Sequence, residues 1–205
     1  MRTLVIDTST RACSVALFVD GRLAASYYEV IGRGHAERLL PFMADLPDRG
    51  RADQIAVNVG PGSFTGIRVG VAAARALGFA WGVPVTGYGC LTLVAAMARA
   101  GRNIAVDVVM TGGHGEYFFQ SFDDDGLATS PAASLLPSMV QANVNAELIA
   151  GDLPPDMRAM LNNDGIVDVL PDAAFWHLIA DVAPLAPSPI YGRAPDAQMP
   201  KVTGA

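Results

Sequence analysis

The chain reads Gly60-Pro61-Gly62-Ser63-Phe64-Thr65-Gly66-Ile67-Arg68 between a buried strand predicted over residues 55–59 and a helix predicted over residues 65–81. Ser63 or Thr65 can cap that helix, and the free backbone amides of a helix N-terminus attract anions. The segment lacks the Gly-Lys-Ser/Thr ending of a P-loop, and threonine stands at position 65, where a Gly-x-Gly-x-x-Gly fingerprint needs glycine. Two interpretations stay open: a phosphate-binding turn, or a strand-to-helix turn whose glycines permit positive φ and close packing.

The predicted helix carries small residues at every fourth position, namely Gly66, Gly70, Ala74, Gly78 and Gly82. Each glycine inside a helix costs roughly 1 kcal/mol relative to alanine, so close packing must offset that cost. The stripe either admits a partner's backbone, while larger residues such as Ile67 and Trp81 pack on the chain's own sheet, or it faces that sheet itself. Either way one apolar face lacks an obvious cover within the chain, which predicts an intermolecular interface.

The elements before this segment alternate in the pattern of an α/β fold. Strands are predicted over residues 3–7, 13–19 and 23–30, with a tight turn at Asp20-Gly21. A helix begins at His35, because apolar residues then recur at helical spacing. These apolar residues are Leu39, Leu40, Phe42, Met43 and Leu46.

The same pattern restarts near residue 100. Strands are predicted over residues 104–111 and 117–122, and they lead to an acidic turn that ends at Gly126, as the first hairpin leads to Gly21. This similarity indicates an internal duplication with an N-terminal half over residues 1–100 and a shortened C-terminal half over residues 101–205. A further helix is predicted over residues 172–183.

Composition excludes several classes of protein. Charged residues make up 17% of the chain, against about 25% in typical domains, so the sequence is not that of a disordered protein. The longest apolar stretch, residues 69–83, is interrupted by Arg75 and is shorter than the roughly 20 residues of a membrane span. The first residues reach Asp7 after only three apolar positions, which predicts a cytoplasmic protein without a signal peptide. A net charge of −6 argues against a broad electrostatic contact with nucleic acid.

Few residues are candidates for chemistry. Asp7 ends the first strand, where ribonuclease-H-like and actin-like folds place a carboxylate, but a turn-stabilising role is an equal alternative. The histidines at 35, 114 and 177 lack the spacing of a zinc pair, so no metal site is expected. Cys13 and Cys90 also lack metal-type spacing and are interpreted as small buried apolar residues.

Three segments together resemble the bacterial TsaB (YeaZ) family. They are Ile6-Asp7-Thr8-Ser9-Thr10 with Ser14-Val15-Ala16-Leu17, His35-Ala36-Glu37-Arg38-Leu39-Leu40-Pro41, and above all Gly60-Pro61-Gly62-Ser63-Phe64-Thr65-Gly66-Ile67-Arg68-Val69-Gly70. The resemblance covers residues 1 to about 100 and resumes at Pro189-Ile190-Tyr191-Gly192-Arg193. Between them, Thr111-Gly112-Gly113-His114 replaces the family's Asp-Ala-Arg turn before Gly115-Glu116, so the role of that turn does not carry over.

The resemblance implies an actin-like ATPase (ASKHA) fold with two ribonuclease-H-like halves, each a mixed sheet flanked by helices. It also implies a non-catalytic subunit of the complex that adds threonylcarbamoyl to adenosine 37 of tRNA. Such a subunit binds and activates a TsaD-like catalytic subunit, is joined by a TsaE-like ATPase, and forms a homodimer when alone. It reaches tRNA only through the complex.

Two sets of site residues follow from this resemblance and from the stripe. The expected partner interface comprises His35, Leu39, Phe42, Met43, Gly66, Gly70, Ala74 and Gly78. A vestigial nucleotide or anion site is expected at Asp7, Thr8, Gly60, Gly62, Ser63, Thr65 and Arg68. No catalytic residue and no firm cofactor is expected, with ATP or ADP at a subunit junction as the one cofactor considered. On this hypothesis, tryptophan in place of Gly70 or Ala74 prevents TsaD binding and leaves the monomer folded.

Two other classes of function stay open. One is an enzyme of the same fold, either a sugar-kinase-like phosphotransferase or the metallopeptidase suggested by the older glycoprotease label. A kinase needs a complete phosphate loop around Asp7 with a base in the cleft, and a peptidase needs metal ligands that three isolated histidines do not supply. The other is a ligand sensor that keeps a nucleotide cleft without catalysis.

Overall fold

The computed structural model describes residues 1–192, so the predicted exit residue Arg193 and the tail after Pro195 lie outside the described residues. The first half of the chain contains β1 (Arg2–Asp7), β2 (Ala12–Val19), β3 (Arg22–Val30), α1 (His35–Asp45), η1 (Pro47–Gly50), β4 (Gln54–Asn58), α2 (Phe64–Trp81), β5 (Val85–Tyr88) and α3 (Cys90–Arg99). The second contains β6 (Val106–Thr111), β7 (Tyr117–Phe122), β8 (Ala133–Leu135), α4 (Pro137–Asn143), β9 (Leu148–Asp152), α5 (Pro155–Leu161), β10 (Ile166–Asp168) and η2 (Ala173–Ile179).

The two sheets have the same topology, which confirms the predicted duplication. The first has the strand order β3-β2-β1-β4-β5, and the second, read from its other edge, has the order β8-β7-β6-β9-β10. In each sheet the first three strands of the sequence pair antiparallel, and the last two run parallel to the first. Each half is therefore a mixed sheet flanked by helices, as predicted.

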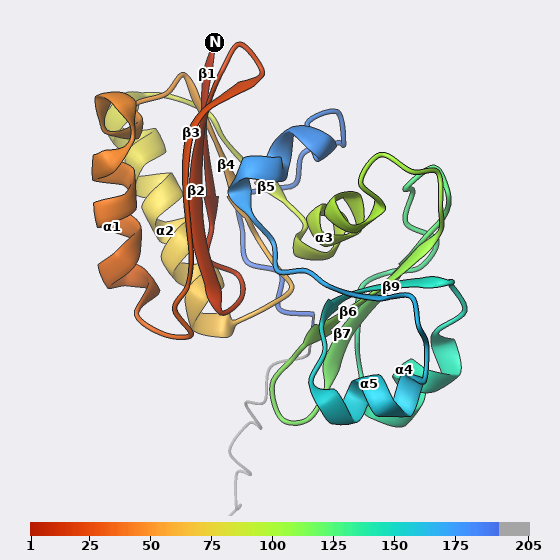
Figure 1. Cartoon of the computed structure of the whole chain (residues 1–205). Helices are drawn as coiled ribbons and strands as arrows, with labels where there is room; N and C mark the ends of the chain where they lie inside the picture. The colour runs from red at the N-terminus through yellow and green to blue at the C-terminus, as the bar shows by residue number, and fades with distance from the viewer. Residues whose placement is uncertain (193–205) are drawn as a thin grey trace, which may run out of the picture.

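Five layers of structure are stacked across the molecule (Figure 1). Helices α1 and α2 cover one face of the first sheet, and α3 with η2 cover its other face. The second sheet packs one face on α3 and the other on α4 and α5. The inner strands of both sheets are buried on both faces, so their successive residues enter different cores, whereas the edge strand β3 is largely exposed. Val5 and Ala16, for example, lie in one core, while Leu4 and Val15 lie in the opposite one.

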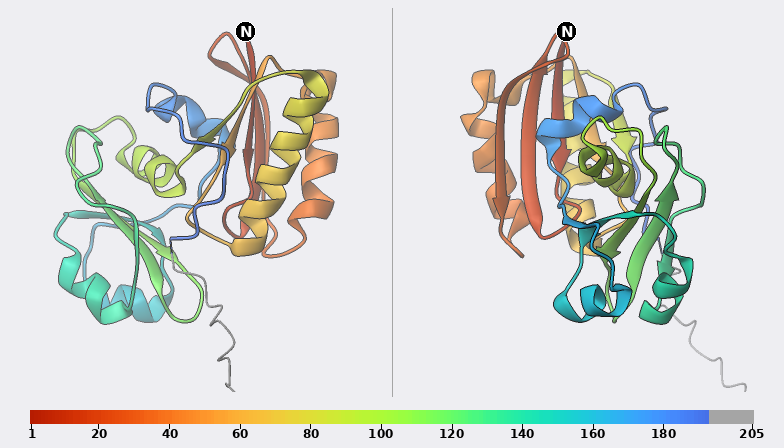
Figure 2. Two further views of the ribbon diagram at one scale, coloured as in Figure 1. Left: turned by 180° about the vertical axis from the view of Figure 1, so that it is seen from behind. Right: turned by 45° about the vertical axis from the view of Figure 1, so that its right-hand side comes forward.

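Helix α3 belongs to both cores. Leu91 and Val94 pack in the core of the second sheet, while Leu93 packs with η2 on the first sheet. Seen from behind, α3 lies between the two sheets (Figure 2). We refer below to the first sheet with α1, α2 and η2 as lobe 1, and to the second sheet with α4 and α5 as lobe 2.

The C-terminal part of the described chain returns from lobe 2 to lobe 1. The helix predicted over residues 172–183 is wrong in type and length, because the chain forms the 3-10 helix η2 over Ala173–Ile179, capped by the Asp172 carboxylate. Leu185 then exchanges backbone hydrogen bonds with Gly87, at 2.8 and 2.9 Å. The amide of Ile190 donates to the carbonyl of Val59 at 2.7 Å, so the segment follows the edge of the first sheet.

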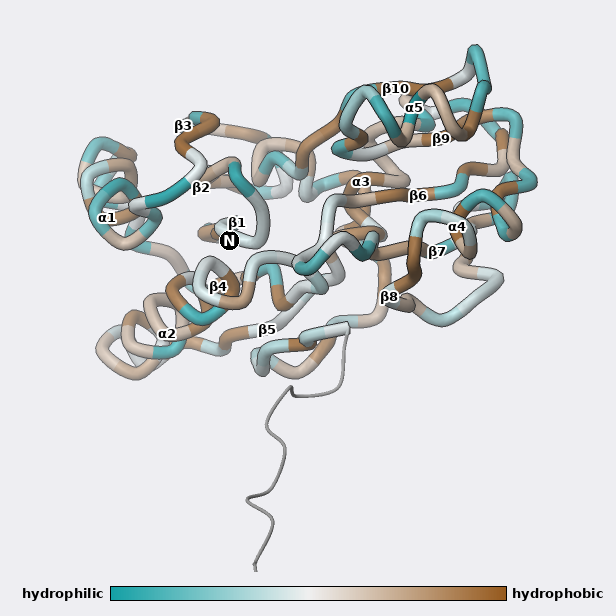
Figure 3. The backbone as a smooth tube through the Cα atoms, turned by 90° about the horizontal axis from the view of Figure 1, so that it is seen from below, coloured by the Kyte–Doolittle hydropathy of each residue, from teal (hydrophilic) through white to brown (hydrophobic). Residues whose placement is uncertain are grey.

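The distribution of hydropathy agrees with this layered arrangement. Viewed from below, β6 and β9 are drawn largely in hydrophobic colours, as expected for strands covered on both faces (Figure 3). None of the helices within residues 1–192 combines the length and the hydropathy needed to cross a bilayer.

Candidate functional site

The glycine-rich segment holds the start of α2 tightly against the turn between β1 and β2. The amide of Ser63 donates to the carbonyl of Ser9 at 2.6 Å, and the Thr8 hydroxyl donates to the carbonyl of Gly66 at 2.7 Å. The Ser63 hydroxyl caps α2 by accepting from the amide of Gly66 at 3.2 Å. A Cβ added to Gly62 would lie 2.1 Å from the Ser9 carbonyl oxygen, and one added to Gly66 would lie 2.0 Å from that of Thr8. These glycines are needed for close packing, the second of the two interpretations given above.

The small-residue stripe of α2 faces the chain's own sheet. A Cβ added to Gly70 would lie 2.5 Å from the Thr8 hydroxyl oxygen, and one added to Gly78 would lie 2.3 Å from a methyl carbon of Val85. Ala74 is fully buried in the same core. The expectation that Gly66, Gly70, Ala74 and Gly78 form an open interface is therefore wrong, because the sheet already covers them.

The residues of α1 expected at the interface are also buried within the chain. Leu39, Phe42 and Met43 lie in the core between α1 and the first sheet. The His35 ring lies with Nε2 at 2.7 Å from the carbonyl oxygen of Thr10 and is likewise buried. All four positions orient α1 on its sheet and leave its other side to solvent, so their expected contact with a partner is wrong as well.

The outward sides of α1 and α2 present a different set of apolar residues. Phe79 is 92% exposed and Leu40 is 63% exposed. Exposed alanines accompany them on the two helices, at positions Ala36, Ala44, Ala72, Ala76 and Ala80. The outward side of α2 thus has its own ridge of small residues at every fourth position, with one large aromatic ring beside it. We call this surface of exposed residues the outer helical face.

Asp7 is sealed inside lobe 1 and does not reach the space between the lobes. Its carboxylate accepts from the amide and hydroxyl of Ser9 at 3.0 and 2.8 Å, from the Asn58 side-chain amide at 2.6 Å, and from the Tyr88 hydroxyl at 3.1 Å. Burial raises the pKa of Asp7, and these hydrogen bonds oppose that rise. The predicted place of Asp7 in an anion site is therefore wrong, because every oxygen of this carboxylate already has a partner.

The buried state of Asp7 predicts a pH dependence of stability. A raised pKa means that the folded chain holds this proton more tightly than the unfolded chain, so the contribution of Asp7 to the unfolding free energy falls as pH rises from 3.8 through the raised value. The stability of the wild-type chain relative to an Asp7→Asn variant should fall over that pH window, measured by urea unfolding at each pH. A constant difference across the window would contradict the assignment.

Both cysteines are buried, as predicted. Burial raises the pKa of the Cys13 thiol and of the Cys90 thiol to about 12. Neither side chain is therefore a thiolate at neutral pH. Within residues 1–192 no group of three or more histidine, cysteine or acidic side chains lies close enough together to hold a metal ion.

A cleft with a volume of about 810 Å³ lies between the lobes. Lobe 1 lines it with Ser9, Thr10, Arg11, Gly32, Pro61, Gly62, Ser63, Phe64 and Arg68, lobe 2 with Met110, Thr111, Gly112, Gly113, His114, Phe118, Ser134 and Asp152, and the returning segment with Tyr191. Of the predicted anion-site residues, only Gly62, Ser63 and Arg68 line this cleft. Thr8 and Gly60 are packed away from it, Gly60 against the carbonyl of Ile190, and Thr65 is exposed elsewhere on α2.

Arg68 lies beside a pair of aromatic rings at the cleft, Phe64 and Tyr191, whose centres are 4.9 Å apart. Its guanidinium carbon is 3.6 Å from the ring centre of Phe64 and 5.3 Å from that of Tyr191. Its Nε donates to the Tyr191 hydroxyl at 2.8 Å. The five ion pairs formed within residues 1–192 do not include Arg68. Arg68 belongs to the glycine-rich segment and Tyr191 to the C-terminal segment, and both segments resemble the TsaB (YeaZ) family in sequence. The structure shows that these two residues are in contact.

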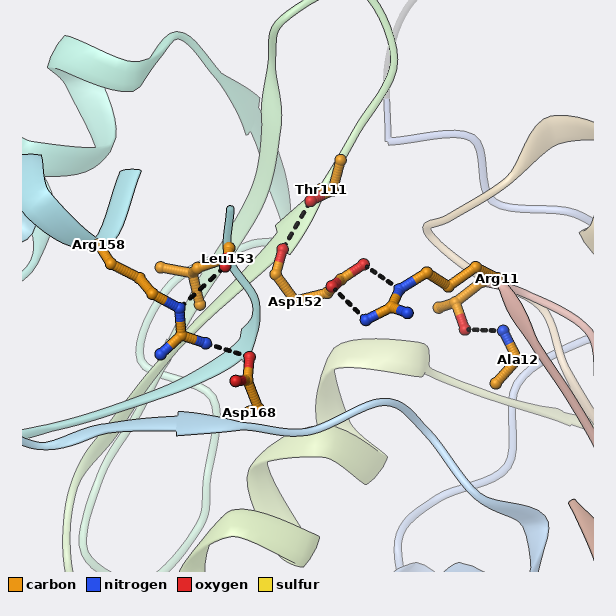
Figure 4. Close-up of polar contacts among 8 residues, drawn as sticks. Arg11, Ala12, Thr111, Asp152, Leu153, Arg158 and Asp168 are labelled. Carbon is orange, nitrogen blue, oxygen red and sulfur yellow. Dashed lines mark hydrogen bonds and ion pairs between the residues drawn. The ribbon is translucent and has the colours of Figure 1, made fainter. Parts of the chain in front are cut away.

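An ion pair that sequence reasoning did not predict crosses the cleft. Arg11, in the turn between β1 and β2, contacts Asp152 at the end of β9 (Figure 4). The hydrogen bond with Asp152 raises the pKa of Arg11. The duplication offered one indirect signal for Asp152. Strand β9 is the counterpart of β4, and the last residue of β4, Asn58, also has a polar side chain at the carboxyl end of its sheet.

The chain is similar to known proteins in both sequence and structure. A family described as "TsaD: tRNA N6-adenosine threonylcarbamoyltransferase" matches residues 28–134, slightly more than half of the chain. The tRNA threonylcarbamoyladenosine biosynthesis protein TsaB of Escherichia coli (strain K12) is 39% identical over 100 residues, which cover 46% of this chain and 43% of that protein. The match thus spans less than half the length of this curated relative.

Longer matches cover nearly the whole chain. An uncharacterized protein of Mycobacterium tuberculosis (strain H37Rv) is 32% identical over 209 residues, covering 95% of this chain and 93% of that protein. Among solved structures, YeaZ from Pseudomonas aeruginosa superposes with a TM-score of 0.78 and 30% identity over 93% of this chain and 99% of that chain.

Proposed function

Since this chain belongs to the TsaB (YeaZ) family, we propose that it acts in the biosynthesis of threonylcarbamoyladenosine in tRNA as the subunit that binds and activates a TsaD-like catalytic subunit. The family assignment confirms the resemblance seen in the glycine-rich segment, and the duplicated topology agrees with it. Binding, activation and the substrate are proposals for this chain, because the curated relatives named TsaB match it over less than half of their length.

The observation that carries this proposal is the outer helical face. A side chain such as Phe79, at 92% exposure, contributes no buried apolar area to the isolated chain. The alanines beside it allow a helix of another protein to approach closely, as in ridge-into-groove packing. Large exposed apolar residues surrounded by small ones are typical of a protein interface.

Co-expression tests the proposal. The chain and the TsaD-like protein of its own organism should co-purify and elute together from a size-exclusion column. Threonylcarbamoylation of a tRNA transcript by the TsaD-like protein should require this chain. Separate elution together with undiminished activity of the TsaD-like protein alone would overturn the proposal.

The same proposal assigns no catalysis to this chain. Asp7, which a phosphotransferase of this fold would place in the cleft, is buried under Asn58 and Tyr88. His35, the buried histidine of α1, contacts the backbone of Thr10 and not another potential ligand. These contacts support an accessory role over the phosphotransferase and metallopeptidase alternatives.

The remaining partners are proposals that the family resemblance implies. A homodimer of the isolated chain would use the same outer helical face, because two copies present identical apolar residues to one another. A TsaE-like ATPase would then join only the complex with the TsaD-like subunit. With a net charge of −6, the chain would contact tRNA only through that complex.

A second candidate function is favoured by Arg68, namely the binding of an anion in the cleft. The cleft does not suit a metal-bound nucleotide, because its one carboxylate, Asp152, is already paired with Arg11. It suits a metal-free anion with an aromatic ring, because the Arg68 guanidinium is exposed there without an ion-pair partner within residues 1–192 and lies beside the rings of Phe64 and Tyr191.

Calorimetry without Mg²⁺ tests this second function. ADP should bind the isolated chain, and an Arg68→Gln variant should bind it about tenfold more weakly, because one charge-assisted contact is lost. An Arg75→Gln variant is the matched control, since Arg75 is an exposed arginine of α2 that does not line the cleft. Absence of heat with the wild-type chain, or equal affinity of the Arg68→Gln variant, would refute anion binding.

A further inference from the structure

The cleft has an ion pair across it that joins the two lobes directly. Arg11 Nε donates to Asp152 Oδ2 at 3.1 Å, and Arg11 Nη2 donates to Asp152 Oδ1 at 2.9 Å. This is the two-point geometry in which an arginine holds a carboxylate most firmly. Both residues line the cleft, Arg11 from lobe 1 and Asp152 from lobe 2.

Each residue of the pair lies on a segment that its own lobe holds in place. The carbonyl of Arg11 accepts from the amides of Ile31 and Gly32, at 3.0 and 2.9 Å. The carbonyl of Asp152 accepts from the Thr111 hydroxyl at 2.6 Å. Each residue of the pair is therefore anchored to the sheet of its own lobe, so the pair connects the two sheets.

No other ion pair within residues 1–192 connects the lobes. The remaining four join Met1 to Asp20, Arg2 to Asp48, Arg38 to Glu29, and Arg158 to Asp168, each within one lobe. The last of these lies close to the Arg11–Asp152 pair and belongs wholly to lobe 2 (Figure 4). It therefore provides a matched control.

Two other connections between the lobes are apolar. The returning segment packs Gly192 between Pro61 of lobe 1 and Phe118 of lobe 2, which both line the cleft. Helix α3 joins the two cores through buried apolar contacts, and none of its residues lines the cleft. Apolar contacts of this kind permit small rotations of one packed layer over another. The Arg11–Asp152 pair is thus positioned to hold the cleft walls together, and α3 offers an axis about which the two sheets can rotate.

From this arrangement we propose that the Arg11–Asp152 ion pair is a latch that fixes the separation of the two lobes, so that loss of the pair widens the cleft. The latch is sensitive to salt, because the side chain of Arg11 is 51% exposed and that of Asp152 is 22% exposed. The proposal concerns the isolated chain and does not depend on partner binding.

Distance measurements between nitroxide labels test the latch. Ala44 on α1 and Ala159 on α5 are exposed residues in the two outermost layers, and the native cysteines are buried, so cysteines introduced at these two positions can be labelled selectively. In the wild-type background at low salt we expect a single distance between the two labels, the shorter of the two distances that the experiment compares. Arg11→Gln and Asp152→Asn should each raise the population of a longer distance about fivefold, to the same extent.

Three further measurements make the test specific. Arg158→Gln should leave the distances unchanged, and the exchange of charges in Arg11→Asp with Asp152→Arg should restore the short distance. High salt should lengthen the distance in the wild-type background and have no effect on Arg11→Gln. Unchanged distances in both single variants, or an effect of salt equal in wild type and Arg11→Gln, would overturn the latch. The salt titration needs no substitution in the pair and so decides the question even if a variant folds poorly.

Discussion

Replacing Gly66 by alanine should reduce the unfolding free energy by about 2–4 kcal/mol. The new Cβ would lie 2.0 Å from the carbonyl oxygen of Thr8, a backbone atom that cannot turn aside. Overpacking of this kind costs about 1–3 kcal/mol, and the shift of the helix start would also weaken the Ser63 cap, which is worth about 1 kcal/mol. In a chain of this length such a loss lowers Tm by about 10 °C.

Thermal and urea unfolding measure this effect, with Gly113→Ala as the matched control. A Cβ on Gly113 would meet nothing within 4 Å, and its φ is not in the left-handed region, so that change should be neutral or slightly stabilising. Gly70→Trp, expected from the sequence to leave the monomer folded, should instead unfold it, since even a Cβ at Gly70 would lie 2.5 Å from the Thr8 hydroxyl. A folded, stable Gly66→Ala chain would show that α2 does not pack as described.

Replacing Phe79 by aspartate should weaken the complex with a TsaD-like subunit at least 100-fold without changing the stability of the isolated chain. An aromatic ring that is 92% exposed loses no intramolecular packing when it is removed, so its substitution should alter stability by less than about 0.5 kcal/mol. At the centre of an interface the same ring is worth about 2–4 kcal/mol, and the buried carboxylate adds a desolvation cost.

Co-purification and titration calorimetry measure the loss, and Leu127→Asp is the control. Leu127 is 67% exposed, but it lies in lobe 2, away from α1 and α2, so its substitution should leave binding intact. Leu40→Asp, on the same outer helical face as Phe79, should weaken binding as well. Full binding by both Phe79→Asp and Leu40→Asp would mean that the partner docks elsewhere, whatever the family of the chain.

Periodicity predicted the elements of the fold because each strand and helix has a side that must be buried. The apolar runs of β1 and β2 and the helical spacing of Leu39, Phe42 and Met43 reflect this requirement. The duplication was visible because both halves begin with the same hairpin. The helix expected over residues 172–183 was wrong, because an apolar run with Phe175 and Trp176 does not distinguish an α-helix from the shorter 3-10 turn that packs on the first sheet.

The orientation of side chains could not be predicted in the same way. A stripe of small residues in α2 shows that one side packs closely, but the sheet and a partner produce the same spacing. Asp7 looks like a site residue at the end of a strand until Asn58 and Tyr88, far along the sequence, are seen to satisfy it. Arg11 and Asp152 are farther apart still in the sequence, and only the stacking of the two sheets brings them together.

The return of the chain to lobe 1 after lobe 2 has a consequence for biosynthesis. Phe18, in the second strand, completes its packing against Trp176, at 5.7 Å between ring centres, and Ser14 accepts from the amide of Ala173. On the ribosome, the face of the first sheet opposite α1 and α2 therefore stays only partly covered, by α3, until η2 has been synthesised after lobe 2. Lobe 1 cannot mature as an independent unit ahead of lobe 2, and the nascent chain exposes an apolar sheet face that chaperones can recognise.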